Sequence, residues 1–218
     1  HIQRGCQLRA EGVPVLKGPE GYYLLATRES EITIAVCDNP IQGQVDLSDS
    51  APKSAGEVVF TEVMTHSKEN RGKDGEWFEL TNTTQKAVNL RGCQLRRPKP
   101  HSPHIISEEV TLKPGQYAIF ANSERPRGIY PDYVYYGGFG LLDDTGRTQA
   151  AITCGETAID VVDLAVQRIS GRSLTLMPHV VTSKANDSLR NWCWAPKPNA
   201  TTSTNSDWSS PKSPNKPC

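Results

Sequence analysis

The amino-acid sequence predicts an all-β protein that folds as a β-sandwich. Short apolar segments recur along the chain, and turn residues separate them about every 8–12 residues. Apolar and polar side chains mostly alternate within these segments, as in strands with one buried face, and no segment has a helical period. The 16 prolines, 17 glycines and 36% hydrophobic residues favour a loop-rich β domain over one large core.

Part of this pattern occurs twice. Residues 4–9 and residues 91–96 both read Arg-Gly-Cys-Gln-Leu-Arg. In each case a Leu-Lys turn and an apolar strand follow, within residues 16–26 and 112–121. Because an internal repeat constrains the architecture before any local analysis, we interpret the chain as one complete and one partial copy of the same β unit.

The repeat divides the chain into four parts. Residues 1–47 are expected to form the partial copy, and residues 57–195 the complete one. Residues 48–56 are small and polar, which is typical of a linker. Residues 196–218 contain five prolines and a single large apolar residue, Trp208, so we expect this tail not to bury enough surface to order by itself.

Strands are expected at short intervals in the complete copy. In the first, residues 57–64, strict alternation would place Val58, Phe60, Glu62 and Met64 on one face. A hairpin is expected between residues 141–142 and 148–153, around an Asp-Asp-Thr-Gly turn. The remaining expected strands are residues 76–82, 87–95, 110–112, 117–121, 159–164, 173–177 and 192–194.

The charge and hydropathy of the chain argue against several classes of partner. Lys and Arg total 24, as do Asp and Glu, so the net charge of zero gives no global attraction to nucleic acid or to an anionic membrane. No segment approaches the ~20 apolar residues that span a bilayer, so membrane insertion is not expected. Residues 1–4 lack an initiator methionine and a signal-peptide core, so we expect the chain to start at a processing site or a cloning boundary.

Six cysteines are present, and their spacing fits no usual zinc site. Fifteen pairings are open to six cysteines, and the repeat selects one of them, because Cys6 and Cys93 occupy equivalent strands while Cys37 and Cys154 lie at the ends of equivalent ones. We therefore predict the disulfides Cys6–Cys37, Cys93–Cys154 and Cys193–Cys218. Disulfides imply a secreted, periplasmic or cell-surface protein; the alternative is six reduced, buried thiols.

Several motifs in the complete copy follow one another in the order found in a known family. They are Glu57–Met64, Gly75–Asn82 with its E-W-x-E-L-x-N pattern, Val88–Leu95, Leu112–Tyr117, Gly171–Leu174, Asn191–Trp192 and Ser213–Asn215. In this order they resemble the lamin tail domain, and the last three resemble closing signatures of its bacterial members. The resemblance implies an immunoglobulin-like β-sandwich of a bacterial, secreted type, with a partial second copy at the N-terminus.

The chain departs from this family at two places. Cys93 stands where the family usually has an aromatic residue, and a disulfide to Cys154 would fill part of that space and link two strands. The partial copy, residues 1–47, lacks the first two strands, and unpaired strand edges attract other strands. We therefore expect packing against the complete copy or self-association with another chain.

No residue pattern in the sequence predicts catalysis, a cofactor or a metal site. A metal at His101 and His104 lacks further ligands nearby, so a solvated loop is the simpler interpretation. Asp143 and Asp144 lie in ordinary turn chemistry and without EF-hand spacing. Glu76 and Glu79 are an odd number of residues apart, which would place them on opposite faces of a strand and argues against a glycosidase.

Two segments are candidates for binding. The most basic stretch contains Arg96 and Arg97 and could contact phosphate, although a solvated loop is the simpler alternative. An aromatic cluster in or beside the loop at residues 122–138 is the stronger candidate, because exposed tyrosines give contact area at a low entropic cost; the alternative is that this loop folds over the sandwich edge. Its members are Tyr130, Tyr133, Tyr135, Tyr136 and Phe139.

The expected function is binding, adhesion or scaffolding without catalysis, outside the cytoplasm. The partner would be a protein or a surface polymer. Two alternatives remain open from the sequence: an accessory domain of a secreted nuclease or phosphatase, and a nucleic-acid-binding module using residues 96–101. Three Asn-x-Ser/Thr sequons begin at Asn82, Asn186 and Asn199, and they would matter only in a eukaryotic secretory pathway.

Overall fold

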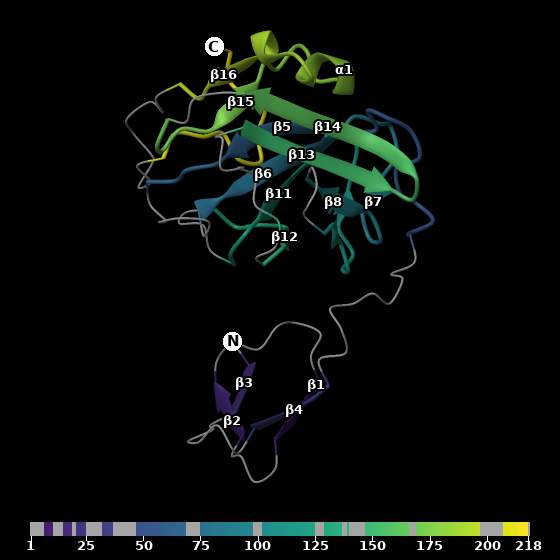
Figure 1. Ribbon diagram of the computed structural model, residues 1–218, viewed down its shortest axis with the longest axis vertical. Coiled ribbons are helices and arrows are strands. Elements are labelled where there is room, and N and C mark those ends of the chain that lie inside the picture. The colour runs from purple at the N-terminus through teal and green to yellow at the C-terminus, as the bar shows by residue number, and fades with distance from the viewer. Residues whose placement is uncertain are drawn as a thin grey trace. The chain divides into compact units, whose positions relative to one another are not determined.

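A computed structural model divides the chain into two compact units, His1–Val45 and Asp46–Cys218 (Figure 1). No helix among the described residues has the length and apolar character needed to cross a membrane. The structure describes residues 7–10, 15–18, 21–24, 32–36, 47–68, 75–97, 102–124, 129–136, 139, 147–165, 169–196 and 207–217.

The first unit contains two separate two-stranded antiparallel sheets. Strand β1 (Gln7–Ala10) pairs with β4 (Ile32–Val36), and β2 (Val15–Gly18) pairs with β3 (Gly21–Leu24). Gln7 pairs with Val36, and these residues adjoin Cys6 and Cys37 in the sequence. Both cysteines lie outside the described residues, so their disulfide stays a prediction.

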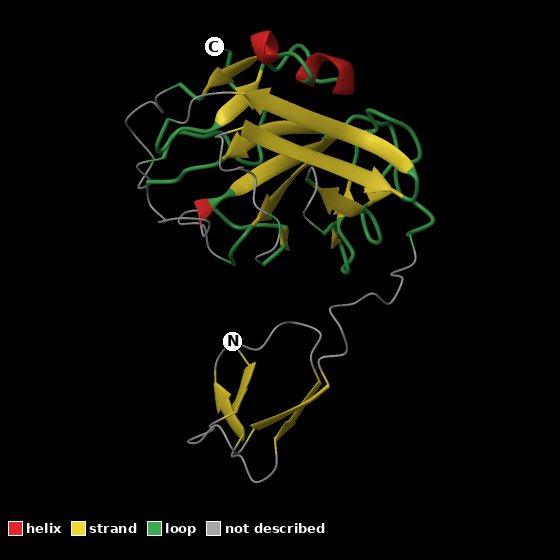
Figure 2. Ribbon diagram, in the orientation of Figure 1, coloured by secondary structure: helices red, strands yellow, loops and turns green. Residues whose placement is uncertain are grey.

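The second unit is the expected β-sandwich, and Figures 1 and 2 show its two layers of strands. One layer is a six-stranded sheet, antiparallel except for the β11–β12 pair: β12 (Tyr133–Val134), β11 (Tyr117–Ala121), β6 (Trp77–Asn82), β5 (Val58–Met64), β15 (Leu174–Leu176) and β16 (Trp192–Trp194). The other is a four-stranded sheet: β14 (Thr157–Ala165), β13 (Arg147–Cys154), β8 (Gln94–Arg96) and β9 (His104–Ile105). A small sheet pairs β7 (Val88–Asn89) with β10 (Thr111–Leu112).

The core lies between these layers. Its centre is Phe78, whose ring lies 5.2 Å from the rings of both Phe60 and Phe120, between centroids. Opposite them, β13 and β14 supply buried residues such as Ile152 and Val162. Aromatic pairs at these distances add to the stabilisation from burial itself.

The strict alternation expected in the first strand is wrong, because β5 contains a bulge at Thr61. Phe60 lies opposite Leu80 and Glu62 lies opposite Glu79, which leaves Thr61 without its own partner. The extra residue reverses the faces that follow it. Phe60 therefore packs in the core, whereas Glu62 points to the other face of the sheet, where its carboxylate bonds to Ser210.

The boundaries of the second unit differ from the expected ones at both ends. Within the predicted linker, the amide of Gly56 donates to the carbonyl of Ile159, and Ser50 accepts from the amide of Asn89, so these residues are part of the sandwich. Of the predicted tail, residues 207–217 bond to the six-stranded sheet. Their composition does not allow independent order, but the sheet supplies the partners they lack.

Two further differences concern local structure. The hairpin closes at Gly155 and Glu156 between β13 and β14, whereas the turn expected at 143–146 lies outside the described residues. A one-turn helix that the sequence did not reveal, α1 (Ser183–Asn186), begins after Thr182, whose side chain accepts from the amide of Ala185. The 3₁₀ helix Leu189–Asn191 follows it.

The disulfide predicted between Cys93 and Cys154 is confirmed. It links β8 to β13 directly beside the register pair Gln94–Thr153, and both cysteines are buried in the core. Cys193 is also disulfide-bonded; its predicted partner, Cys218, lies outside the described residues.

Removing the Cys93–Cys154 disulfide should destabilise the sandwich markedly. The bond closes a loop across 61 positions of the sequence, so we expect Cys93→Ala with Cys154→Ala to lower the free energy of unfolding by about 2–4 kcal/mol. Urea denaturation of the double variant measures this loss. The control, Glu156→Ala in the exposed turn, should unfold like the wild type, and equal stability of all three proteins would contradict a stabilising role for the bond.

Candidate functional site

Residues 207–217, which we call the C-terminal segment, cover the outer face of the six-stranded sheet, the face turned away from the core. This area brings together two buried carboxyl groups, Glu62 on β5 and Glu79 on β6. The bulge at Thr61 places them directly opposite each other on neighbouring strands. Buried acidic pairs are common in active sites, so Glu62 and Glu79 are a candidate functional site.

Glu62 is held entirely by hydroxyl and amide donors of the chain. Its Oε1 accepts from the Ser173 hydroxyl at 2.5 Å and from the Ser210 amide at 2.9 Å. Its Oε2 accepts from the Ser210 hydroxyl at 3.1 Å. Ser210 thus contacts both carboxyl oxygens of a residue that lies 148 positions earlier in the chain.

Glu79 is held in the same way by the next part of the C-terminal segment. Its Oε1 accepts from the Thr61 hydroxyl at 2.8 Å, and its Oε2 from the Lys212 amide at 2.7 Å. Lys212 has a φ of 58°, which is unusual for a residue other than glycine. Its ammonium group donates to Asp132 at 2.8 Å, so one residue bonds to both β6 and the loop before β12.

Asn215 completes the docking of the segment. Its side-chain amide donates to the carbonyls of Thr61 and Leu176, at 2.8 and 2.9 Å, and its Oδ1 accepts from Ser210. One buried side chain therefore bridges β5 and β15. Asn215 belongs to one of the closing signatures that the sequence contains, which is the signal that could have revealed the docking.

The start of the segment is held by a second group of contacts. Asp207 accepts from the Ser67 hydroxyl and, at 2.7 Å, from the Lys68 amide. Trp208 forms a parallel bridge with Arg172, whose guanidinium carbon lies 4.8 Å from the centre of the indole ring. This cation–π contact fixes the aromatic side chain of Trp208 on Arg172, in addition to the polar contacts of the segment.

Burial raises the pKa of both carboxyl groups. The pKa of Glu62 rises from 4.5 to about 7, mainly because burial removes water from the charged form, while Ser173 and Ser210 act in the opposite direction. The pKa of Glu79 likewise rises to about 8, mainly because of burial and also because of the nearby charges of Glu62 and Asp132, while the hydrogen bonds from Lys212 and Thr61 act in the opposite direction. Ser210 and Lys212 of the C-terminal segment donate to these two carboxyl groups, so the pair contributes to the docking of the segment.

A third buried carboxyl group fixes α1 to the sandwich. Asp160 on β14 accepts from the amide of Phe60 at 2.8 Å and from the side chain of Asn186 at 2.6 Å. Burial raises its pKa from 3.8 to about 7. Asn186 starts one sequon and Asn82 another, yet both side chains are buried and donate to neighbouring acceptors; Asn199 lies outside the described residues.

The aromatic cluster predicted for binding is divided by the structure. Tyr133, Tyr135 and Phe139 are buried, so the expectation that they form an exposed surface is wrong. Their rings pack on Phe78, Phe120 and one another, because the loop folds into the edge of the core. Tyr130 and Tyr136 remain exposed, with 83% and 46% of their surface accessible.

The other predicted residues that the structure describes contact neighbouring residues of the second unit. Arg96 donates to Thr153 and Gln94, its neighbours on the four-stranded sheet. Arg97 is half-buried, and residues 98–101, including His101, lie outside the described residues. His104 bonds to the Tyr133 hydroxyl at 2.8 Å. In the described part of the chain, no three His, Cys, Asp or Glu side chains come close enough to hold a metal ion.

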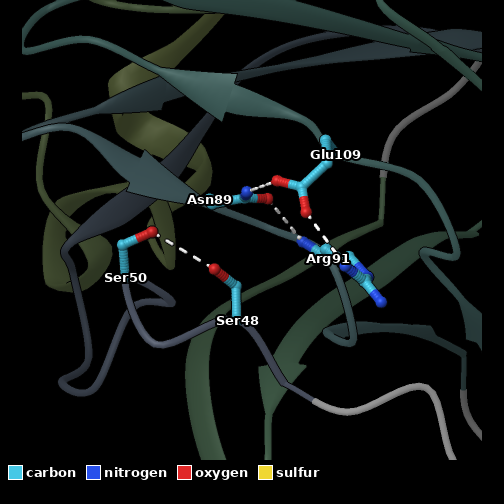
Figure 3. A network of polar contacts seen from close by, with 5 residues as sticks. All are labelled: Ser48, Ser50, Asn89, Arg91 and Glu109. Carbon is cyan, nitrogen blue, oxygen red and sulfur yellow. Dashed lines mark hydrogen bonds and ion pairs between the residues drawn. The ribbon is translucent and has the colours of Figure 1, made fainter.

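A separate polar network fixes the start of the second unit (Figure 3). Glu109 accepts from Arg91 at 3.1 Å and from the side chain of Asn89, whose Oδ1 accepts from the Arg91 amide. The backbones of Ser48 and Ser50 bond to Arg91 and Asn89, which anchors the incoming chain at β7. The ion pair is exposed, so its role is to position the chain more than to stabilise it.

The chain matches a known protein family. Residues 51–177, more than half of the chain, match the family described as Lamin Tail Domain. Comparisons with curated proteins and with solved structures return no match. The C-terminal segment, residues 207–217, lies beyond the matched residues, although it bonds to the matched strands β5 and β6.

The stability of the second unit should fall as the pH rises from about 5 to 8. The folded state binds more protons than the unfolded state in this range. The pKa values of Glu62 and Glu79 rise from 4.5 to about 7 and 8, and that of Asp160 rises from 3.8 to about 7. Each raised group lowers the free energy of unfolding by about 1.4 kcal/mol per pH unit between its two pKa values. Urea denaturation across this range measures the slope.

The variant Glu79→Gln tests the cause of this slope. It removes one ionisable group but keeps a side chain that can accept and donate hydrogen bonds. The slope should therefore become shallower, with Glu62 and Asp160 still contributing, and the variant should be more stable than the wild type above pH ~8. Glu156→Gln, in an exposed turn, should keep the wild-type profile. A wild-type slope in Glu79→Gln would show that this carboxyl group is not the cause.

Proposed function

Because the chain belongs to the lamin tail domain family, we propose that it is a non-enzymatic binding or scaffolding module of an extracytoplasmic protein. The sandwich is a rigid support whose acidic groups are engaged with the chain itself. The module would bind a partner through its surface, and the exposed aromatic residues Tyr130 and Tyr136 are the strongest candidates for the contact.

The position of these two tyrosines supports a role in binding. They flank β12, the edge strand of the six-stranded sheet, and their neighbours Tyr133 and Tyr135 are buried in the core. Tyrosine rings that are exposed beside buried neighbours give contact area at a low entropic cost when they bind. Tyr136 has a φ of 27°, a strained value for a residue other than glycine, and such strain is concentrated at functional positions.

The extracytoplasmic location is supported by the cysteines. Cys93–Cys154 is a disulfide within the sandwich, and Cys193 is in a disulfide as well. Structural disulfides form and persist in oxidising compartments and are rare in the cytosol. A secreted, periplasmic or surface-anchored protein is the natural setting for such a module, and its partner would be a protein or a surface polymer.

Photo-crosslinking on the native cell tests the proposed binding surface. A photoreactive amino acid placed at Tyr130 should crosslink to an extracytoplasmic protein or polymer, because this side chain is 83% exposed beside β12. The control position is Val161, which is also exposed but lies on the four-stranded sheet. Equal crosslinking from both positions, or capture of cytosolic partners only, would contradict the proposal.

A further inference from the structure

The C-terminal segment is bound to the sheet in the way that a peptide ligand is bound. Among the described residues it adds no strand to the sheet, and its pairing with the sheet is the single bridge of Trp208 to Arg172. Its other contacts are hydrogen bonds to side chains and carbonyls, through residues such as Ser210, Lys212 and Asn215. Docking through such contacts depends on the identity of particular residues of the segment.

The area that receives the segment, which we call the docking site, is polar. It consists of the carboxyl groups of Glu62 and Glu79, the Ser173 hydroxyl and the carbonyls of Thr61 and Leu176. The main core lies on the opposite face of the sheet, and a smaller apolar cluster with Trp77 and Ile119 lies on the same face beside Glu79. Water can therefore replace the segment at these polar groups without opening the main core. An empty docking site is therefore compatible with a folded sandwich.

The contacts are also complementary in charge at several places. Asp207 meets the amide of Lys68, Lys212 pairs with Asp132, and backbone amides meet the two glutamates. A partner must therefore present an acidic residue, two free amides and a carboxamide at the right spacing. The C-terminal segment of another copy of this chain presents them all.

We propose that the docking site also binds the C-terminal segment of a second copy, so that two chains associate by exchanging these segments. Attachment to its own chain gives the segment an effective concentration that favours docking in cis. Exchange uses identical contacts and closes symmetrically into a dimer. The inference deepens the proposed scaffolding function, since it names a second copy of the chain as a partner.

Two defective chains that complement each other test this exchange. Both carry Cys193→Ser and Cys218→Ser, so that no covalent link at this end holds the segment. One chain also carries Asn215→Ala, which removes the hydrogen bonds of the segment to Thr61 and Leu176. The other carries Glu62→Ala, which removes the acceptor for Ser210 from the docking site. Light scattering after gel filtration should give the 24.0 kDa monomer for each alone and twice that mass for their mixture.

A matched control and an opposite outcome accompany this measurement. Lys216 is exposed and lies beside Asn215, so a chain with Lys216→Ala in place of Asn215→Ala keeps an intact segment in its own docking site and should form less dimer with the Glu62→Ala chain. A mixture that stays monomeric, while circular dichroism shows both chains folded, overturns the proposal.

A second measurement decides the matter if a variant fails to fold. The chain with Cys193→Ser and Cys218→Ser is cut at a protease site introduced within residues 197–206, the released segment is removed by gel filtration, and a fluorescein-labelled peptide of residues 207–217 is added. The peptide should bind, and Asn215→Ala in the peptide should weaken binding at least tenfold, whereas Lys216→Ala should leave it unchanged. Absence of saturable binding overturns the exchange but leaves the crosslinking result at Tyr130 unaffected.

Discussion

The second unit depends on two carboxyl groups that face each other on neighbouring strands. The bulge at Thr61 puts Glu62 opposite Glu79, and like charges in such a position destabilise a sheet. Burial is tolerated only because hydroxyl and amide donors surround both groups, and Ser210 and Lys212 of the C-terminal segment supply several of them. The segment is therefore a structural part of the sandwich, although it is distant in the sequence.

The sequence predicted those features that depend on regular patterns. Strand positions and the sandwich class follow from the mostly alternating apolar and polar residues and the regular turn residues. The pairing of Cys93 with Cys154 follows from the repeated sequence pattern. Other features depend on tertiary context. The extra residue Thr61 reverses the faces of β5 without changing its composition, and Tyr133 and Tyr135 look like surface residues until the core provides a place for their rings.

The repeat interpretation also explains what the first unit lacks. Its β1–β4 pair has the antiparallel pairing of β8 with β13, and each pair begins beside an equivalent cysteine in the sequence. The segments that would correspond to β5 and β6 are missing from residues 1–47.

Ionisation links the docking of the segment to pH. Once Glu62 and Glu79 both carry charge, the buried pair is disfavoured, and either global unfolding or departure of the segment exposes it to water. Global unfolding breaks the packing of the core around Phe78. Departure of the segment breaks its polar contacts and the contact between Trp208 and Arg172. The second route therefore requires less free energy. Ionisation of the same carboxyl groups that hold the segment in place thus favours its departure over global unfolding as the pH rises.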